Sequence, residues 1–224
     1  MDIILKHFPD ISEKQRIDFL RYTQLFKFWN KKINLVSRKD IDNFHEKHIL
    51  HSLSIAKFIK FKKNTVVVDF GTGGGLPGIP LAIFFPDVKF MLVDSIKKKI
   101  TAVNNMVDEL SLSNIKTFDD RLENLNFEYD FLVTRAVAKI PKIIKFSSKC
   151  YKKKSFNSMK NGIIALKGGD ISNELNITNH HTITPLINLL NEKQFDKKKI
   201  VYVSMTWINL LITWTTSHHS HHEL

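Results

Sequence analysis

The segment VVVDFGTGGGLPGIP, residues 66–80, decides the fold of this chain. Its apolar start predicts a short strand over 65–69 that is buried on both faces, as strands of parallel sheets are. Four glycines then lie within positions 71–75, and two prolines bracket the predicted start of a helix. Glycine adopts positive φ without strain and leaves room where other residues carry a Cβ. The segment therefore predicts a strand, a ligand-binding turn and a helix in succession.

Alternating strands and helices are predicted after this segment. The helical spacing of Val103, Met106, Val107 and Leu110 indicates a helix, and Ser95 can cap its start. Repeated units of this kind are typical of an open α/β sheet with helices on both faces. The predicted strands after the first cover 88–93, 115–118, 130–134, 162–166 and 200–204.

The residues before the sheet have a helical pattern. The sequence SEKQ, residues 12–15, forms a capping box that opens one helix, and a second helix is predicted over 41–59. At the other end of the chain, four closely spaced histidines have no predicted fold that would fix metal-ligand geometry, so we expect a disordered tail and no metal site. The predicted divisions are a helical extension over 1–62, a ligand-binding domain over 63–204 and the tail over 205–224.

The composition limits the class of protein. Of 224 residues 43% are hydrophobic, which is enough for a sizeable core, and the formal net charge is +12. The single cysteine, Cys150, excludes an internal disulfide and favours a reducing compartment. We recognise neither a leader peptide nor an apolar run long enough to cross a bilayer, so we expect a cytoplasmic protein without a membrane partner.

Charge is unevenly distributed along the chain. Lys and Arg outnumber Asp and Glu in residues 1–64 and 136–224, whereas acidic residues are in excess over 65–135. A small ligand bound by the middle and a polyanion bound across the flanks would fit this pattern. The alternative is that a lysine-rich composition only keeps the surface soluble.

Three ligand classes use glycine-rich turns of this kind. A phosphate-binding P-loop needs Lys and then Ser or Thr after its last glycine, but Ile-Pro follows Gly78 here. The dinucleotide fingerprint Gly-x-Gly-x-x-Gly fails at Leu76 when it starts at Gly71, and the frame from Gly73 begins too far after the strand. The P-loop and the nicotinamide or flavin classes are therefore disfavoured.

The third class has the pattern Asp-x-Gly-x-Gly-x-Gly, formed here by Asp69, Gly71, Gly73 and Gly75. It resembles the first motif of class I S-adenosylmethionine-dependent methyltransferases. The next predicted strand ends at Asp94, whose carboxylate can accept hydrogen bonds from both hydroxyls of a ribose. The alternative for Asp94 is a structural role as the cap of the following helix.

A closer resemblance covers about residues 20–204 and rests on six segments that occur in one order. The segments are FWNKKINLVS (28–37), HEKHILHSL (45–53), DFGTGGGLPGIPLAI (69–83), LVDSIKKKI (92–100), YDFLVTRAVA (129–138) and GIIALKGG (162–169). Together they resemble the bacterial small-subunit ribosomal RNA (guanine-N7) methyltransferases, also called the glucose-inhibited division protein B family. The resemblance implies a class I methyltransferase (Rossmann-like) fold with a helical N-terminal extension, S-adenosylmethionine as cofactor, and 16S ribosomal RNA or the small ribosomal subunit as partner.

The same resemblance assigns roles in the predicted cofactor site. Gly71 and Leu76 would line the methionine and ribose side, whereas Leu122 and Glu123 would lie against the adenine. Arg135 would lie beside the cofactor at the end of the fourth strand. The alternatives are core packing for Leu122 and a surface salt bridge for Arg135. The full predicted cofactor set is Gly71, Gly73, Gly75, Leu76, Asp94, Leu122, Glu123 and Arg135.

Methyl transfer to guanine N7 makes limited chemical demands. Because N7 has a free lone pair and no proton, we expect no general base and no catalytic side chain, only positioning of N7 against the methyl group. N7 is hidden in the deep groove of duplex RNA, which favours a loop or a displaced base as the target. His48 and Trp29 fit a structural role at least as well as an RNA contact. The residues expected to contact RNA are Lys31, Lys32, Arg38 and Lys47.

Two other functions stay open on the sequence alone. A basic RNA-binding or ribosome-assembly protein could keep this fold without catalysis, and a methyltransferase could act on another RNA or on a small molecule. Cofactor binding distinguishes an enzyme from the first alternative, and salt-dependent RNA affinity distinguishes an RNA enzyme from a small-molecule enzyme. No stable protein partner is expected.

Overall fold

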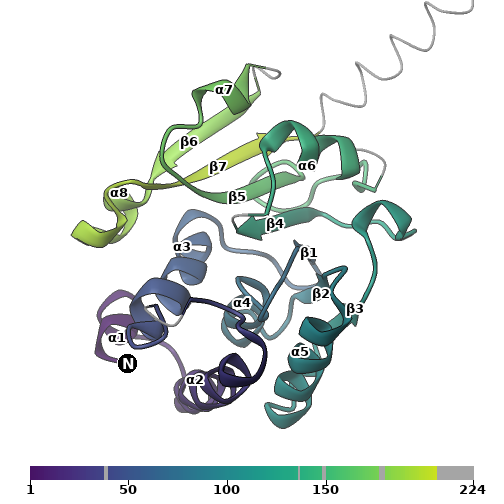
Figure 1. Ribbon diagram of the computed structural model, residues 1–224. Coiled ribbons are helices and arrows are strands. Elements are labelled where there is room, and N and C mark those ends of the chain that lie inside the picture. Colours follow the sequence, from purple (N-terminus) through teal and green to yellow (C-terminus); the bar gives the residue numbers. More distant parts are fainter. Residues whose placement is uncertain (38–39, 136, 148–149, 177–179, 206–224) are drawn as a thin grey trace, which may run out of the picture.

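The chain forms a seven-stranded sheet with helices packed on both faces (Figure 1). The structure, a computed structural model, describes residues 1–37, 40–135, 137–147, 150–176 and 180–205. The predicted RNA contact Arg38 and the predicted tail beyond residue 205 lie outside the described residues. No described helix is both long and apolar enough to cross a membrane. The strands are β1 (Val66–Phe70), β2 (Lys89–Val93), β3 (Ile115–Phe118), β4 (Phe131–Arg135), β5 (Gly162–Gly168), β6 (His181–Pro185) and β7 (Lys198–Ser204).

The order of the strands creates a binding position at the centre of the sheet. The order is β3-β2-β1-β4-β5-β7-β6, with β1 to β5 parallel and β7 antiparallel to both β5 and β6. β1 pairs with β2 on one side and with β4 on the other, so the strand order reverses there. Ligands of open α/β sheets bind beyond the carboxyl ends of the strands at such a point. The glycine turn leaves β1 at this position.

The helices form two layers, and each layer packs against one face of the sheet around its own hydrophobic core. Successive strand residues point to opposite faces, and accordingly Val67 belongs to one core and Val68 to the other. α1 to α5 and α8 pack in the first core, and α6 and α7 pack in the second (Figure 1). The helices are α1 (Asp2–His7), α2 (Glu13–Ile33), α3 (His51–Phe58), α4 (Gly78–Phe84), α5 (Lys97–Glu109), α6 (Ile140–Ser147), α7 (Ser172–Leu175) and α8 (Leu186–Leu190), with the π-helical turn η1 (His45–Leu50) and the 3-10 turns η2 (Leu122–Asn124) and η3 (Lys193–Phe195).

Several local expectations need correction. The helix predicted over 41–59 is the π-helical turn η1 followed by α3. Ser95 does not cap α5: the capping position is Ile96, whose N–H donates to Asp94 Oδ1 at 2.9 Å. β6 was not predicted because it is an edge strand with three exposed residues, and it therefore lacks the apolar run of the central strands.

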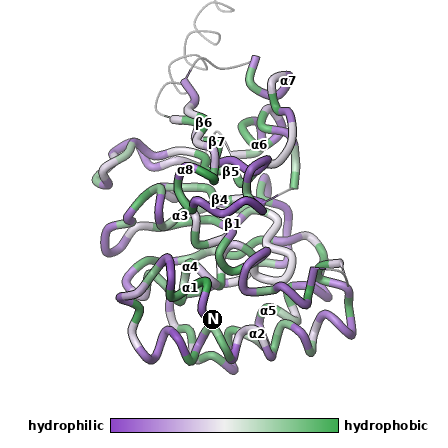
Figure 2. The backbone as a smooth tube through the Cα atoms, turned by 90° about the vertical axis from the view of Figure 1, so that its left-hand side faces the viewer, coloured by the Kyte–Doolittle hydropathy of each residue, from purple (hydrophilic) through white to green (hydrophobic). Residues whose placement is uncertain are grey.

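α2 connects the N-terminal helices to the glycine turn. Its capping box is confirmed by reciprocal hydrogen bonds between Ser12 and Gln15, and hydrophilic and hydrophobic stretches alternate along it at the edge of the molecule (Figure 2). The Tyr22 hydroxyl donates to the Gly74 carbonyl at 3.0 Å. A Cβ on Gly74 would lie 2.5 Å from the ring of Phe26. α2 therefore supports the turn directly, whereas the division into extension and sheet domain stays a prediction.

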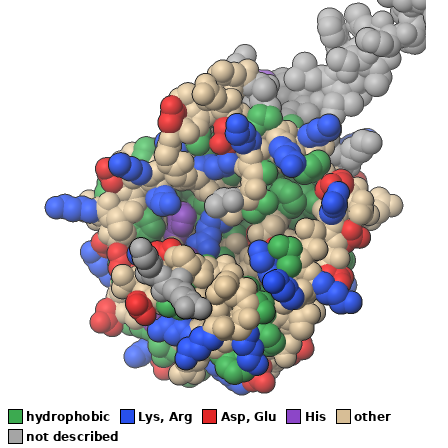
Figure 3. Space-filling view, in the orientation of Figure 1, with side chains coloured by type: hydrophobic (Ala, Val, Ile, Leu, Met, Phe, Trp, Pro, Cys, Tyr) green, Lys and Arg blue, Asp and Glu red, His purple; other side chains and the backbone are tan. Residues whose placement is uncertain are grey.

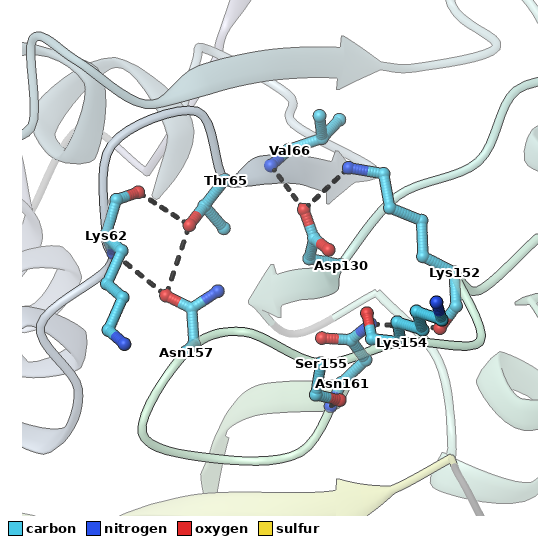
Figure 4. Close-up of polar contacts among 9 residues, drawn as sticks. All are labelled: Lys62, Thr65, Val66, Asp130, Lys152, Lys154, Ser155, Asn157 and Asn161. Atoms are coloured by element: carbon cyan, nitrogen blue, oxygen red, sulfur yellow. Dashed lines mark hydrogen bonds and ion pairs between the residues drawn. The ribbon is translucent and has the colours of Figure 1, made fainter.

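A polar cluster at the amino ends of β1 and β4 holds the loop that precedes β5 (Figure 4). Fully buried Asp130 accepts from the Val66 N–H at 2.8 Å and from Lys152 Nζ at 2.9 Å, both through Oδ2. In the same loop, Asn157 Oδ1 accepts from the Thr65 hydroxyl at 3.1 Å. A buried charge is costly unless it is paired and hydrogen-bonded, so Lys152 is the partner that stabilises Asp130.

Asp130→Asn is expected to lower the free energy of unfolding by about 1–3 kcal/mol. The amide oxygen can still accept from Val66, but Lys152 loses its counter-charge in a position that is 31% exposed, and charged hydrogen bonds contribute about 1.5–3 kcal/mol. Urea unfolding at neutral pH measures the loss. Lys152→Met added to the variant should cost little more, since the interaction is already gone. An unchanged midpoint would mean that the pair does not stabilise the fold.

Candidate functional site

A cavity of about 620 Å³ lies at the carboxyl ends of β1, β2 and β4. This is the point where the strand order reverses, and the volume is in the range of small-molecule sites. Of the eight predicted cofactor residues, Gly75 does not line the cavity. The seven that do are Gly71, Gly73, Leu76, Asp94, Leu122, Glu123 and Arg135.

The positions of the turn require glycine for different structural reasons. Gly73 has φ +58°, and a Cβ built on it would have no atom within 4 Å. Its missing side chain therefore leaves open space in the cavity wall, into which a ligand fits. Gly75 has φ +88°, and a Cβ there would lie 2.4 Å from Ile79 of α4. Gly75 shapes the turn and allows α4 to pack against it, while Gly73 forms the cradle that fits the predicted cofactor.

Asp94 joins the end of β2 to the glycine turn. Its carboxylate is 8% exposed and accepts from the Gly73 N–H through Oδ2 and from the Ile96 N–H through Oδ1, each at 2.9 Å. A carboxylate has about four lone-pair positions, so room remains for two further donors such as ribose hydroxyls. Asp94 thus holds the start of α5 and also lines the cavity. Ribose binding stays a prediction.

The remaining wall of the cavity combines buried and exposed apolar groups. Leu122, at the start of η2, is 1% exposed and belongs to the second core. It also lines the cavity, so it has the core packing considered as an alternative and a place in the cavity wall as well. Ile96 lines the same cavity and is 41% exposed. An exposed apolar side chain at a cavity offers a face for a ring. Sequence reasoning missed Ile96, although its position just after Asp94 was a usable signal.

Arg135 ends β4 and does not form the surface salt bridge considered as an alternative. Its Nη1 donates to His48 Nδ1 at 2.9 Å, and no ion pair between described residues includes it. Burial and the nearby Arg135 charge lower the pKa of His48 from 6.5 to about 4, so the imidazole is neutral and can accept this bond. A partly buried cation that forms no close ion pair with a described carboxylate favours an anionic group on a ligand.

Asp69, the acid of the glycine motif, lies fully buried beneath the turn. Its Oδ2 accepts from the Thr72 hydroxyl at 2.6 Å and from the Gly78 N–H at 2.8 Å. Burial raises the pKa of Asp69 from 3.8 to about 7, against the opposing effect of these hydrogen bonds. Oδ1 has no hydrogen-bond partner among the described residues. Asp69 therefore closes the turn onto the start of α4 and does not line the cavity.

Asp69→Asn is expected to remove a pH dependence of stability. Because the folded-state pKa of about 7 lies above the unfolded value of 3.8, the folded protein holds this proton more tightly. The wild type therefore loses stability as pH rises through this window, by roughly 1–4 kcal/mol. The amide does not titrate, so the variant should gain relative to the wild type between about pH 5 and pH 8. Urea unfolding of both proteins at the two pH values measures this gain. If the difference in free energy of unfolding between variant and wild type is the same at both pH values, the raised pKa of Asp69 is wrong.

Lys31 and Lys32 are exposed in the last turn of α2. Neither takes part in an ion pair with a described residue, and Lys32 Nζ lies 4.1 Å from the ring centroid of Phe28. Leu35, just beyond α2, lines the cavity. The structure thus places two exposed cations on the segment that leads into the cavity wall.

Lys47 differs from the other predicted RNA contacts. It is exposed in η1, but its Nζ lies 2.7 Å from Asp40 Oδ1 in an ion pair. Hydrogen bonds from Lys47 and Ser37 lower the pKa of Asp40 from 3.8 to about 2. The charge of Lys47 is therefore largely compensated. Arg38, the fourth predicted contact, is not among the described residues.

Solved structures with a similar fold include one protein in complex with S-adenosylmethionine and one methyltransferase. A mutant of MtNAS in complex with S-adenosylmethionine has a TM-score of 0.53, covering 85% of this chain and 73% of that chain at 9% identity. A precorrin-6y C5,15-methyltransferase from Geobacter metallireducens has a TM-score of 0.50, covering 76% of this chain and 90% of that chain at 9% identity. The predicted Rossmann-like methyltransferase fold is confirmed.

Close relatives match nearly the whole chain. The ribosomal RNA small subunit methyltransferase G of Flavobacterium johnsoniae is 45% identical over 205 residues, covering 92% of this chain and 98% of the relative. The protein of the same name from Bacteroides thetaiotaomicron is 46% identical over 203 residues, covering 90% of this chain and 98% of the relative. The profile of the GidB family, described as rRNA small subunit methyltransferase G, matches residues 15–201. The resemblance seen in the six sequence segments is thereby confirmed, and the chain belongs to the rRNA small subunit methyltransferase G family.

Proposed function

We propose that this protein transfers a methyl group from S-adenosylmethionine to N7 of a guanine in 16S ribosomal RNA of the small subunit, in the cytoplasm. One observation carries the proposal: Gly73 opens onto a cavity whose wall includes Asp94, hydrogen-bonded to Gly73 itself. In a chain of this family, that arrangement fits the ribose and the adjoining part of the cofactor. The relatives named above carry a name for methyl transfer to small-subunit ribosomal RNA.

The cavity supplies the contacts that this cofactor needs. Asp94 accepts hydrogen bonds from the ribose hydroxyls, Ile96 and Leu122 face the adenine, and Arg135 offers a cation to the carboxylate of the methionine part. The turn at Gly73 brings the backbone close without a side chain in the way. The other predicted cofactor residues complete the wall or, for Gly75, shape the turn: Gly71, Gly75, Leu76 and Glu123.

The chemistry places few demands on side chains. When bound, S-adenosylmethionine supplies a methyl group on a positively charged sulfur, and guanine N7 accepts it with its own lone pair. No proton has to be removed, so no general base is required. Orientation of the reacting atoms can contribute roughly 7–11 kcal/mol. The chain's task is therefore to hold both molecules in line and to exclude water.

RNA binding in this proposal uses the basic segments beside the cavity. Lys31 and Lys32 contact phosphates from the end of α2. Lys47 contributes after release from Asp40, and Arg38 is the fourth predicted contact. Contacts of this kind release counterions, so RNA affinity should fall steeply with salt.

Methyl transfer from radiolabelled S-adenosylmethionine tests the proposal. The acceptors are purified small subunits and naked 16S ribosomal RNA, both from cells that lack this activity, and the product is mapped by cleavage at N7-methylguanine. Label at a single guanine supports reaction, substrate and atom together. Cofactor binding without label on either acceptor would assign another substrate, and absence of cofactor binding would assign a non-catalytic RNA-binding protein.

A further inference from the structure

A second cavity, of about 740 Å³, adjoins the cofactor cavity. Arg135 and Val137 line both, so the two spaces meet at the carboxyl end of β4. The wall of the second cavity comes from η1, α3, β4, β5, α7, η3 and β7, from the segment after β4 and from Asp40. A volume of this size admits a nucleotide.

Basic groups and imidazoles surround this second cavity. Lys47, Lys139 and Lys198 line it, and Figure 3 shows histidine beside Lys or Arg atoms in the hollowed middle of this face. His48 and His51 are 7% and 6% exposed, and the Nε2 atom of each has no hydrogen-bond partner among the described residues. Buried polar atoms in native proteins are usually satisfied, which favours a polar ligand here.

One ion pair in the wall is held in a fixed position. Lys167 Nζ of β5 lies 2.8 Å from Glu174 Oε2 of α7, and the two side chains are 10% and 17% exposed. Lys167 Nζ also donates to the Ala138 carbonyl at 2.6 Å, and Glu174 Oε2 also accepts from the Ile140 N–H at 2.9 Å. Both side chains are thereby fixed against the segment that separates the two cavities.

Both members of the pair keep capacity for a ligand. Lysine has three N–H donors, and the contacts of Lys167 with Ala138 and Glu174 use two of them. Glu174 uses Oε2 for both of its hydrogen bonds, which leaves Oε1 without a partner in the described part of the chain. A donor therefore lies next to an acceptor in the wall of one cavity.

We propose that the second cavity binds the acceptor guanine and that Lys167 and Glu174 recognise its Watson–Crick edge. O6 accepts from Lys167, while N1–H and the N2 amino group donate to Glu174 Oε1. N7 lies on the opposite side of O6 from N1, so it stays free to face the cofactor cavity past Arg135 and Val137. This assignment rests on the proposed function and adds the residues that choose the base.

The pair selects guanine over adenine by its pattern of donor and acceptor. Adenine presents an amino donor where guanine has O6, and an acceptor at N1 where guanine has N–H. Lys167 and Glu174 would each face a group of the wrong kind, and unpaired buried polar groups strongly reject such a ligand. The same carboxylate also lies near the positive charge that methylation leaves on guanine, where a fixed negative group stabilises the product-like state.

Nucleotide binding to the full-length protein tests this without RNA. With the cofactor site saturated by S-adenosylhomocysteine, calorimetry measures the affinities of GMP, IMP and AMP. IMP lacks only the N2 amino group. The wild type should bind GMP about tenfold more tightly than IMP, since a hydrogen bond to a charged group contributes about that factor, and it should bind AMP more weakly than IMP because both groups of the pair are then mismatched. Glu174→Gln should lower the GMP affinity about tenfold, reduce the preference for GMP over IMP, raise the AMP affinity because the amide can donate to adenine N1, and leave the S-adenosylhomocysteine affinity unchanged.

A matched control separates recognition from stability. Glu192→Gln breaks an ion pair with Lys6 outside the cavity and should leave all three nucleotide affinities unchanged. Equal losses for GMP and AMP in Glu174→Gln, or no saturable GMP binding by the wild type, would overturn the inference even if the enzyme methylates RNA. GMP selectivity that depends on Glu174 supports it even if methyl transfer to 16S ribosomal RNA fails, so the two proposals fail separately.

Discussion

Gly73→Val should weaken binding of S-adenosylmethionine by at least about 100-fold. The new side chain would enter space where a Cβ has no neighbour within 4 Å, and this space is the part of the cavity that the ligand needs. Valine adds three carbon atoms there, and each carbon atom that a fitted site cannot accommodate costs about 1–3 kcal/mol, so the total reaches at least about 3 kcal/mol. Calorimetric titration with S-adenosylhomocysteine measures the loss, and methyl transfer should fall with it.

The backbone strain of this substitution can be matched elsewhere in the chain. Gly169 has φ +70°, and a Cβ there also has no atom within 4 Å, but Gly169 does not line the cofactor cavity. Gly169→Val therefore carries a similar conformational cost, about 1–2 kcal/mol for a left-handed residue with a side chain. It should lower stability to a similar extent and leave cofactor affinity intact. Normal affinity in Gly73→Val, or an equal loss in Gly169→Val, would remove Gly73 from the cofactor site.

Reversing both charges in the double variant Lys31→Glu, Lys32→Glu should weaken RNA binding by about 100-fold at low salt. Each phosphate contact with single-stranded RNA contributes a salt slope of about 0.7, which amounts to nearly tenfold in affinity at about 50 mM salt. Both lysines are exposed and outside any ion pair between described residues, so the fold should tolerate the change. The salt slope of RNA affinity should fall by about 1.4, and cofactor affinity should not change.

The loop before β5 offers a control with the same change in net charge. Lys153 and Lys154 are exposed neighbours at the amino ends of the strands, at the opposite edge of the sheet from the cofactor cavity. The double variant Lys153→Glu, Lys154→Glu should reduce RNA affinity much less. Equal losses in the two double variants would mean that net charge alone, and no contact at α2, determines binding.

Local motifs were the part of the site that sequence could predict. Gly73 and Asp94 each follow directly from a strand that ends at the same edge of a parallel sheet, so their convergence follows from the topology. Arg135 was assigned through the resemblance to the family, and its place at the end of β4 agrees with the same topology.

Contacts that depend on packing between distant segments could not be predicted. The bond between Arg135 and His48 joins residues 87 positions apart and depends on the π-helical turn η1, for which no sequence pattern was recognised. The pairing of Lys47 with Asp40 is also a matter of loop conformation, and it changes an apparent free cation into a compensated one. The edge strand β6 was not predicted because residues on both of its faces are exposed, so its sequence lacks an apolar run.

The hydrogen bond from Tyr22 to Gly74 has a consequence for hydrogen exchange. Because α2 rests on the glycine turn and shares its core, the amides of the turn should exchange with solvent only in openings that also detach α2. An RNA that holds α2 by Lys31 and Lys32 would suppress those openings, and the turn would become more protected although no nucleotide contacts it. Ordering by one ligand then lowers the entropic cost of binding the other, so RNA and cofactor would bind with positive cooperativity without a change of shape.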